Sequence, residues 1–390
     1  MAQIEELLAR NWAAPRTGAA PLPLSDGFHA LPWTEIDRAA LIPAWDALAR
    51  TAAEPNPFYE PGFLIPSLEQ FDPAGKVHLA MLVDGGRLTG LMPSWRDRDY
   101  HGHPLPNIAA WQHPNAFCGV PLVAPGHEGR FWRAYLECVD SKAGKSLLLH
   151  LPQMPGDSSV TAALLQLCED SGRSCRTVHR EQRALLRSGL APEEHLTSAM
   201  STKKRKELRR QSNRLADEGE VRFERRRDES GLTEWSADFL ALEQRGWKGA
   251  NGSALACDPR TETLFVTTLA NAAAAGRLER LTLWCADRPV AMLATFLAAP
   301  GAFAFKTTFD EDFARFSPGM LLQVENLALL DDPRIAWCDS CAAADHPMIE
   351  RIWRDRREMV GLSIAIGGKL RRRLGASLAA IEAHRVEKRA

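Results

Sequence analysis

The chain has 390 residues, of which 45% are hydrophobic and 25% are charged, so it can form two globular domains of roughly 150 residues each. Its formal net charge of -1 gives no field over the whole molecule, and a charged partner must therefore be held by a local patch. This composition excludes a disordered or fibrous protein.

The N-terminal extension, residues 1–24, has acidic residues in its first turn and no continuous apolar core, unlike a secretory signal. No other stretch reaches the roughly 20 uncharged apolar residues of a membrane-spanning helix. The eight cysteines are scattered among apolar residues rather than spaced as a secreted disulfide framework. We therefore expect a cytoplasmic protein.

Two groups of side chains have the atoms of a metal site without its spacing. Cys338 and Cys341 form a single CxxC pair, whereas a structural zinc site usually takes its four ligands from two such pairs. The segment 101–107, "HGHPLPN", with His113 and Cys118, matches no recurring site and predicts a loop between strands. We expect no metal cofactor.

The first half of the chain predicts a mixed α and β domain that ends near residue 195. Its elements are a helix over 34–52 between Pro-rich segments, a hairpin over 76–100 with Asp84-Gly85-Gly86 as its turn, a strand over 145–152, and a helix over 157–173 with Asp157 or Ser158 as cap and Gly172 as stop.

A basic patch follows at residues 198–227, with eleven Lys or Arg against five Asp or Glu. It has the charge of a nucleic-acid helix, but no aromatic residue lies between 201 and 222 and no docking motif surrounds it. A solvated helix that contacts phosphate is the favoured alternative, and we expect no nucleic-acid partner.

The second half repeats the layout of the first. Its predicted elements are helices over 232–249 and 261–277, a hairpin over 278–299 that turns at Ala286-Asp287, a strand over 302–309, a helix over 318–330, a short strand over 335–341 and a helix over 346–359.

This order resembles the GNAT acyltransferase fold, and residues 198–357 resemble the acyltransferase domain of CelD/BcsL-type proteins, relatives of the Fem peptidyltransferases that are associated with cellulose biosynthesis. The segments that carry the resemblance are "STKKRKELRRQSNRL", "WKGANGSALA", "GRLERLTLWCADRPVAMLATF", "FKTTFDEDFARFSPGMLL" and "WCDSCAAADHPMIERIW". It implies an α/β (α+β) fold of tandem GNAT-like domains, each with a mixed, mostly antiparallel sheet flanked by helices. The domains would be a degenerate one over 25–195 and the acyltransferase over 196–368, followed by a basic helix over 369–390.

The turn "SPG" before the helix at 318 is suited to an anion. The first amides of a helix have no internal partners and its dipole favours negative charge. Pro318 loses no useful hydrogen bond at the first helical position, and Ser317 can cap. The resemblance implies that Ser317, Gly319 and Met320 bind the pyrophosphate of coenzyme A, with Arg315 as charge partner; a simple capped core helix is the alternative.

The resemblance also implies direct attack of an amine on a thioester, with amides of the strand 290–298 polarising the carbonyl and a base taking the proton. Candidate bases are Glu243, Asp310, Asp339 and His346. Each has a structural alternative, such as a turn or helix cap or a solvated helix face.

Tyrosine is absent from the second half, because the three tyrosines are Tyr59, Tyr100 and Tyr135. Relatives often use a tyrosine as acid where Phe309 stands here. A coenzyme A thiol has a pKa near that of Cys, about 8.5, so its thiolate can leave with water as the acid.

Three residues are candidates for substrate binding. Lys306 lies in an apolar strand and needs a carboxylate, such as Asp339 or an acidic ligand. Trp247 and Lys248 lie in a Gly-flanked loop, where an aromatic ring and a cation can hold a substrate.

The C-terminal residues 351–390 contain eleven Lys or Arg against four Asp or Glu. A basic amphipathic helix of this kind either rests on the inner membrane surface or packs on its own domain.

Together these features predict an acyl-CoA-dependent N-acyltransferase whose donor is acyl-CoA or an acyl-carrier thioester. The acceptor would be an amino sugar, a polysaccharide precursor or a long-chain amine such as a sphingoid base. A Fem-like transferase that uses aminoacyl-tRNA and a non-catalytic scaffold for polysaccharide export are the alternatives.

Overall fold

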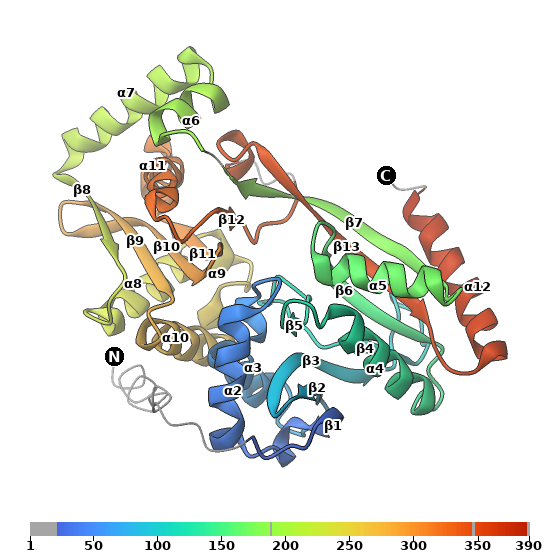
Figure 1. The fold of residues 1–390 in the computed structure, drawn as a ribbon. Helices are drawn as coiled ribbons and strands as arrows, with labels where there is room; N and C mark the ends of the chain where they lie inside the picture. The colour runs from blue at the N-terminus through green and yellow to red at the C-terminus, as the bar shows by residue number, and fades with distance from the viewer. Residues whose placement is uncertain (1–21, 188, 345–347, 388–390) are drawn as a thin grey trace. The chain divides into compact units, whose positions relative to one another are not determined.

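The computed structural model describes residues 22–187, 189–344 and 348–387 (Figure 1). Contacts divide the chain into two compact units. The inserted unit is Arg183–Arg356, and the flanking unit consists of the described residues up to Gln182 together with those from Arg357 onward. Most of the expected extension 1–24 lies outside the described residues.

The flanking unit contains the four elements predicted for the first half of the chain. Its strands are β1 (Gly27–Pro32), β2 (His78–Asp84), β3 (Arg87–Asp97), β4 (Asn107–Ala110), β5 (Leu122–Val123), β6 (Leu148–Pro155) and most of β7 (Cys175–Leu186) and β13 (Asp355–Ala365). Its helices are α2 (Arg38–Thr51), α3 (Pro61–Phe71), α4 (Glu128–Ser141), α5 (Ser159–Asp170) and α12 (Lys369–Glu387).

The sheet of this unit has the order β1-β2-β3-β4-β6-β13-β7, and the pair of β4 with β6 is parallel. Gly85 and Gly86 turn the β2–β3 hairpin with positive φ angles, as glycine allows. Of the two predicted caps of α5, Ser158 is the cap, since its hydroxyl accepts the Val160 amide at 3.1 Å.

One predicted helix is wrong, and one Pro-rich segment contains a helix that was not predicted. The Pro-rich segment 54–73, to which the sequence analysis assigned no element, contains α3, because Pro61 occupies a first-turn position where no amide is needed. Of the helix predicted over 346–359, the described residues instead form a short 3-10 turn at Ile349–Arg351 followed by β13.

The strand β13 was not predicted because of the character of the apolar run that begins at Met359. Its residues are buried on both faces of the strand, so they show neither the alternation of a half-buried strand nor a helical period. Because β13 pairs with β6, residues 357–368 lie in the flanking unit, whereas the sequence analysis places them in the second domain.

The inserted unit has strands in the order β8-β9-β10-β11-β12. Its strands are β8 (Val221–Arg226), β9 (Leu278–Cys285), β10 (Arg288–Ala298), β11 (Gly301–Phe309) and β12 (Trp337–Asp339), and its helices are α6 (Pro192–Ala199), α7 (Thr202–Glu218), α8 (Leu232–Arg245), α9 (Trp247–Ala250), α10 (Pro259–Ala274) and α11 (Pro318–Glu325).

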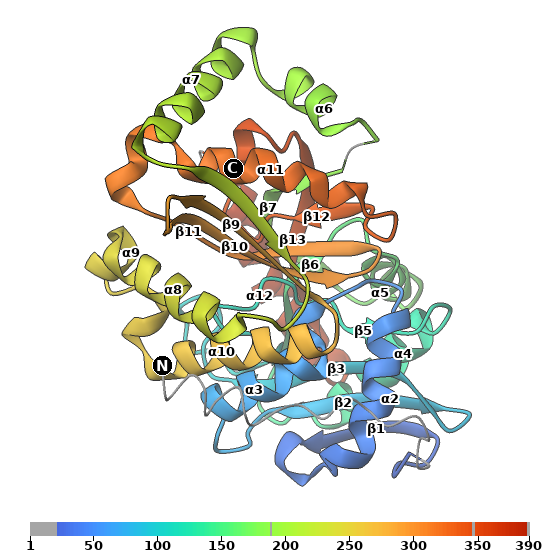
Figure 2. The same cartoon turned by 90° about the vertical axis from the view of Figure 1, so that its left-hand side faces the viewer.

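Helices cover both faces of this sheet. α8 and α10 lie on one face, and α7 and α11 lie on the other (Figure 2). Leu208 and Leu215 of α7 and Leu321 and Leu322 of α11 are buried in one apolar cluster with β9 and β10. The predicted fold of mixed, mostly antiparallel sheets flanked by helices is confirmed.

None of the helices in the described part of the chain is long and apolar enough to cross a membrane.

Candidate active site

The site begins at an open strand edge. β11 pairs with β12 only from Gly301 to Phe303, whereas it pairs with β10 as far as Phe309. The edge of β11 beyond Phe303 therefore has no strand partner among the described residues, and its backbone groups can meet a ligand. The prediction that strand 290–298 supplies free amides is wrong, because β10 pairs with both β9 and β11.

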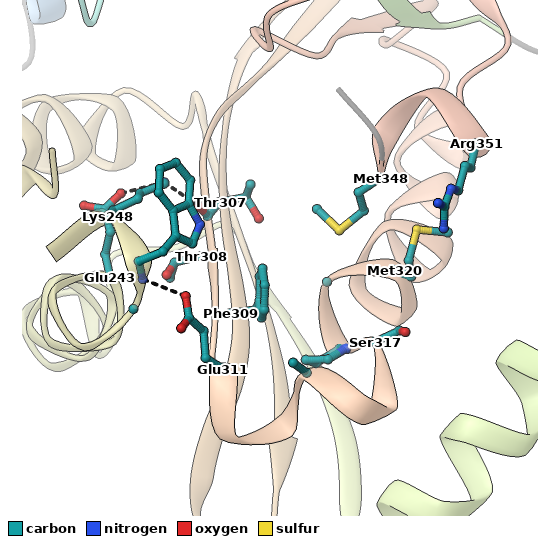
Figure 3. A pocket seen from close by; sticks show the side chains of 15 residues that line it. Glu243, Lys248, Thr307, Thr308, Phe309, Glu311, Ser317, Met320, Met348 and Arg351 are labelled. Carbon is teal, nitrogen blue, oxygen red and sulfur yellow. Dashed lines mark hydrogen bonds and ion pairs between the residues drawn. The ribbon is translucent and has the colours of Figure 1, made fainter. Parts of the chain in front are cut away.

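A cavity of about 550 Å³ lies along this edge. Figure 3 shows Glu243 and Lys248 on one side of β11, and Ser317, Met320, Met348 and Arg351 on the other. The lining residues are Glu243, Gly246, Trp247, Lys248, Thr307, Thr308, Phe309, Glu311, Ala314, Ser317, Pro318, Gly319, Met320, Met348 and Arg351. The cavity thus joins the first turn of α11 to the open edge of β11.

At the start of α11, Ser317 adopts a left-handed conformation with φ 54°. Its hydroxyl does not cap the helix, contrary to the prediction, but its carbonyl accepts the amides of Met320 and Leu321 at 2.9 and 3.1 Å. Pro318 has no amide hydrogen, so Gly319 supplies the first N–H of α11 that has no partner in the described chain. One free amide and the positive end of the helix dipole face this part of the cavity.

Gly319 is closely packed against Met348. A Cβ atom built on it would lie 2.6 Å from Sδ of Met348 and 3.6 Å from the ring of Phe309. Only glycine keeps the backbone of this turn open to a ligand without displacing Met348.

The cation at this end of the cavity is Arg351, which the sequence analysis missed. Arg351 is exposed, lines the cavity and has no partner among the described residues. The predicted cation, Arg315, instead pairs with Glu218 at 2.7 Å and stacks over Phe316, and it does not line the cavity. Arg351 lies in the 3-10 turn Ile349–Arg351, where the sequence analysis predicted a helix, so its place at the cavity could not be read from spacing.

At the other end, the buried Glu243 forms an ion pair with the partly exposed Lys248, with 2.8 Å between Oε1 and Nζ. The other oxygen of Glu243 accepts the Leu255 amide at 2.8 Å. Lys248 also donates to the carbonyl of Thr307 at 3.0 Å, so it ties α8 and α9 to the open edge of β11. These three contacts fix the cavity wall.

The other predicted bases lie elsewhere. Asp310 caps the turn after β11, and its carboxylate pairs with the Arg288 guanidinium at 2.6 Å. Asp339 is buried, and its carboxylate lies 3.6 Å from the Arg183 guanidinium. Neither lines the cavity. His346 lies outside the described residues.

A carboxylate that the sequence analysis overlooked, Glu311, does line the cavity and accepts the Trp247 amide at 2.6 Å. Its place next to Asp310, in a run of three acids, was the only signal for it.

The three predicted substrate residues differ in position. Trp247 lines the cavity and is 54% exposed, and Lys248 also lines it. Lys306 does not line it, and its ammonium group lies 5.5 Å from the centre of the Phe305 ring. Burial, together with the neighbouring Lys248, lowers the pKa of Lys306 to about 8.

Comparisons with known proteins agree with this geometry. Residues 202–346 match the sequence model of an acetyltransferase (GNAT) domain. The structure of FemX is similar with a TM-score of 0.55 at 11% identity, over 83% of this chain and 96% of FemX. No curated protein matches the sequence.

A second similar structure is the C-terminal domain (DUF2156) of a protein assigned as a lysylphosphatidylglycerol synthetase from Agrobacterium fabrum. Its TM-score is 0.53 at 14% identity, over 89% of this chain and 97% of that domain. At such identities the two structures establish the fold. The match of residues 202–346 shows that this part of the chain is a GNAT-type acetyltransferase domain, which supports an acyltransferase enzyme.

Proposed function

We propose that the protein is an acyl-CoA-dependent N-acyltransferase that transfers an acyl group from the thioester to an amine by direct attack. The observation that carries this proposal is the single cavity that joins the α11 N-terminus to the open edge of β11. The resemblance of residues 198–357 to CelD/BcsL-type proteins favours an amino sugar or polysaccharide precursor as acceptor, with a long-chain amine such as a sphingoid base as the alternative.

The donor end has the chemistry that a pyrophosphate requires. The Gly319 amide and the α11 dipole favour an anion, and Arg351 supplies a guanidinium group for a phosphate oxygen. We assign Ser317 and Met320 the role of shaping this turn, since the carbonyl of Ser317 holds the amide of Met320.

The reaction end lies at Thr307. In an antiparallel strand the N–H and C=O of one residue point to the same side. Lys248 donates a hydrogen bond to the Thr307 carbonyl at the open edge of β11, so this carbonyl points away from β10. The Thr307 amide therefore points to the open edge as well. This amide is placed to polarise a thioester carbonyl in the cavity.

Glu243 is the one predicted base that lines the cavity, but both of its oxygens accept hydrogen bonds. We therefore assign it the role of holding Lys248 against β11. Phe309 lines the cavity at the position of the expected tyrosine, so the thiolate would leave with water as its acid, and that water would take up the proton that the amine loses.

The test is a thermal-shift series from acetyl-CoA to palmitoyl-CoA on the full chain. A donor at 100 times its Kd should stabilise the protein by about 2.7 kcal/mol, and Arg351→Ala should reduce its affinity about tenfold. Arg315→Ala is the matched control and should leave it unchanged, because Arg315 faces Glu218. If no coenzyme A ester stabilises the protein, the proposal is overturned.

A second candidate is a transferase that takes its acyl group from aminoacyl-tRNA, and the surface of α7 favours it. Five exposed cations of α7 have no partner among the described residues: Lys203, Lys204, Lys206, Arg209 and Arg214. Tight tRNA binding that weakens steeply with salt would support this candidate over acyl-CoA.

A further inference from the structure

α12 is attached to the flanking unit by one of its faces. Gly375 packs so closely that a Cβ atom built on it would lie 2.5 Å from the carbonyl oxygen of Leu147. Ala379 is fully buried beside it, and Arg372 forms an ion pair with Asp140. These contacts determine which side of the helix faces away from the unit.

The outward face carries an apolar stripe. Leu370, Leu374 and Ile381 are 75%, 60% and 55% exposed, more than any other large apolar side chain in the described residues. With the exposed Ser377 they follow at intervals of four, three and four residues, which places them on one face of the helix. Water-exposed apolar side chains aligned in this way indicate an interaction surface.

Cations border the stripe. Lys369 and Arg373 are exposed on one side of it and have no partner in the described part of the chain. Arg385 lies on the other side of the stripe. Its guanidinium donates a hydrogen bond to the His103 ring and forms an ion pair with Glu382 at 3.1 Å. Glu382 is the one acid among the described side chains of α12, and it is mostly buried.

We propose that α12 lies in the plane of an anionic lipid surface. The stripe of Leu370, Leu374 and Ile381 enters the boundary between headgroups and acyl chains, while Lys369 and Arg373 meet lipid phosphates. The charge pattern disfavours a second copy of the chain, because two such helices would bring like charges together. The stripe is also small beside the roughly 800 Å² per partner of a stable protein interface.

This proposal uses no residue of the cavity and is independent of the proposed function. A chain held at a membrane by α12 would be placed to meet acceptors or donors that reside in lipid.

The test is co-sedimentation of the full chain with vesicles. The wild-type protein should bind vesicles of phosphatidylcholine and phosphatidylglycerol, release from them at high salt, and bind phosphatidylcholine alone much more weakly. The triple variant L370S/L374S/I381S and the double variant K369E/R373E should each bind the anionic vesicles about tenfold more weakly.

Two control variants separate this surface from general effects. Leu165→Ser alters an apolar side chain of α5 that is 42% exposed, and K203E/K206E alters the other basic helix, α7. Both should bind vesicles as the wild type does, and circular dichroism should show that all variants are folded.

Three results would overturn the proposal. The first is wild-type protein that does not bind anionic vesicles, and the second is an equal loss of binding in the α7 variant. The third is a triple variant that keeps its vesicle binding but changes from dimer to monomer in analytical ultracentrifugation, which would make a second copy the occupant.

Discussion

The two units contain the same motif, a pair of parallel strands connected through a helix, but they differ in what lies beside it. In the inserted unit β11 and β12 separate after Phe303, and a cavity of about 550 Å³ lies along the open edge. In the flanking unit β4 and β6 pair only at Ile108 and Ala109. A later segment of the chain then contacts β6, because the Gly119 amide donates to the Gln153 carbonyl at 3.0 Å.

The difference teaches that one strand arrangement can provide either a binding site or a structural contact. Backbone groups at a separated strand pair need partners. In the flanking unit the protein supplies one such partner from its own chain, whereas in the inserted unit Lys248 contacts the edge at Thr307 and the cavity borders it.

The largest expected effect is on the filled edge of the flanking unit. A Cβ atom on Gly119 would lie 2.1 Å from the carbonyl oxygen of Pro152, so Gly119→Ala must move backbone. We expect a loss of about 3 kcal/mol in the free energy of unfolding, measured by urea denaturation. Gly129→Ala, which meets no atom within 4 Å, is the control; equal stability of the two variants would show that Gly119 is not packed against β6.

A smaller effect is expected at the first turns of the corresponding helices. Gly319 in α11 and Gly129 in α4 each occupy the second helical position, but only the former is closed in by Met348. Gly319→Ala should push Met348 into the cavity and weaken donor binding about tenfold, whereas Gly129→Ala should leave it unchanged. Isothermal titration with the best acyl-CoA measures both, and equal affinities would separate α11 from donor binding.

The smallest expected effect concerns Lys306. This residue marks another difference between the units, because β11 carries it whereas the corresponding strand β4 carries no charged residue. Its pKa of about 8 lies below the roughly 10.4 of an unfolded lysine, so the unfolded chain binds more protons between these values. Stability should therefore rise as the pH increases from about 8 to about 10.4.

Lys306→Met should remove this rise and stabilise the protein by about 1 kcal/mol at pH 7, measured by denaturation across pH. Lys145→Met, at an exposed lysine of the flanking unit, should change neither. A rise that persists in the Lys306 variant would assign it to another group.

Local patterns were sufficient for most of the fold. The hairpins at Asp84-Gly85-Gly86 and Ala286-Asp287 follow from short-range turn chemistry, and both are present. Capping chemistry limited the α5 cap to Asp157 or Ser158, and the structure selects Ser158. β13 was missed because burial on both faces removes the periodicity by which a strand is recognised.

The candidate site was only partly predictable. Six of the predicted site residues line one cavity: Glu243, Trp247, Lys248, Ser317, Gly319 and Met320. The carboxylates Asp310 and Asp339 and the cation Arg315 have ordinary partners instead, in Arg288, Arg183 and Glu218. A spacing in the sequence shows which groups are present, whereas ion pairing depends on which segments the fold brings together.

The sequence by itself determined most of the succession of helices and strands, with exceptions such as α3 and β13, together with the turn before α11 and the basic character of α7 and α12, because each depends on neighbours within a few residues. The tertiary structure decided that Arg351 rather than Arg315 lines the cavity, that β11 beyond Phe303 has no strand partner among the described residues, and that Leu370 and Leu374 of α12 point outward. These outcomes depend on contacts between residues far apart in the chain, such as Gly319 with Met348 and Gly375 with Leu147, which no local pattern encodes.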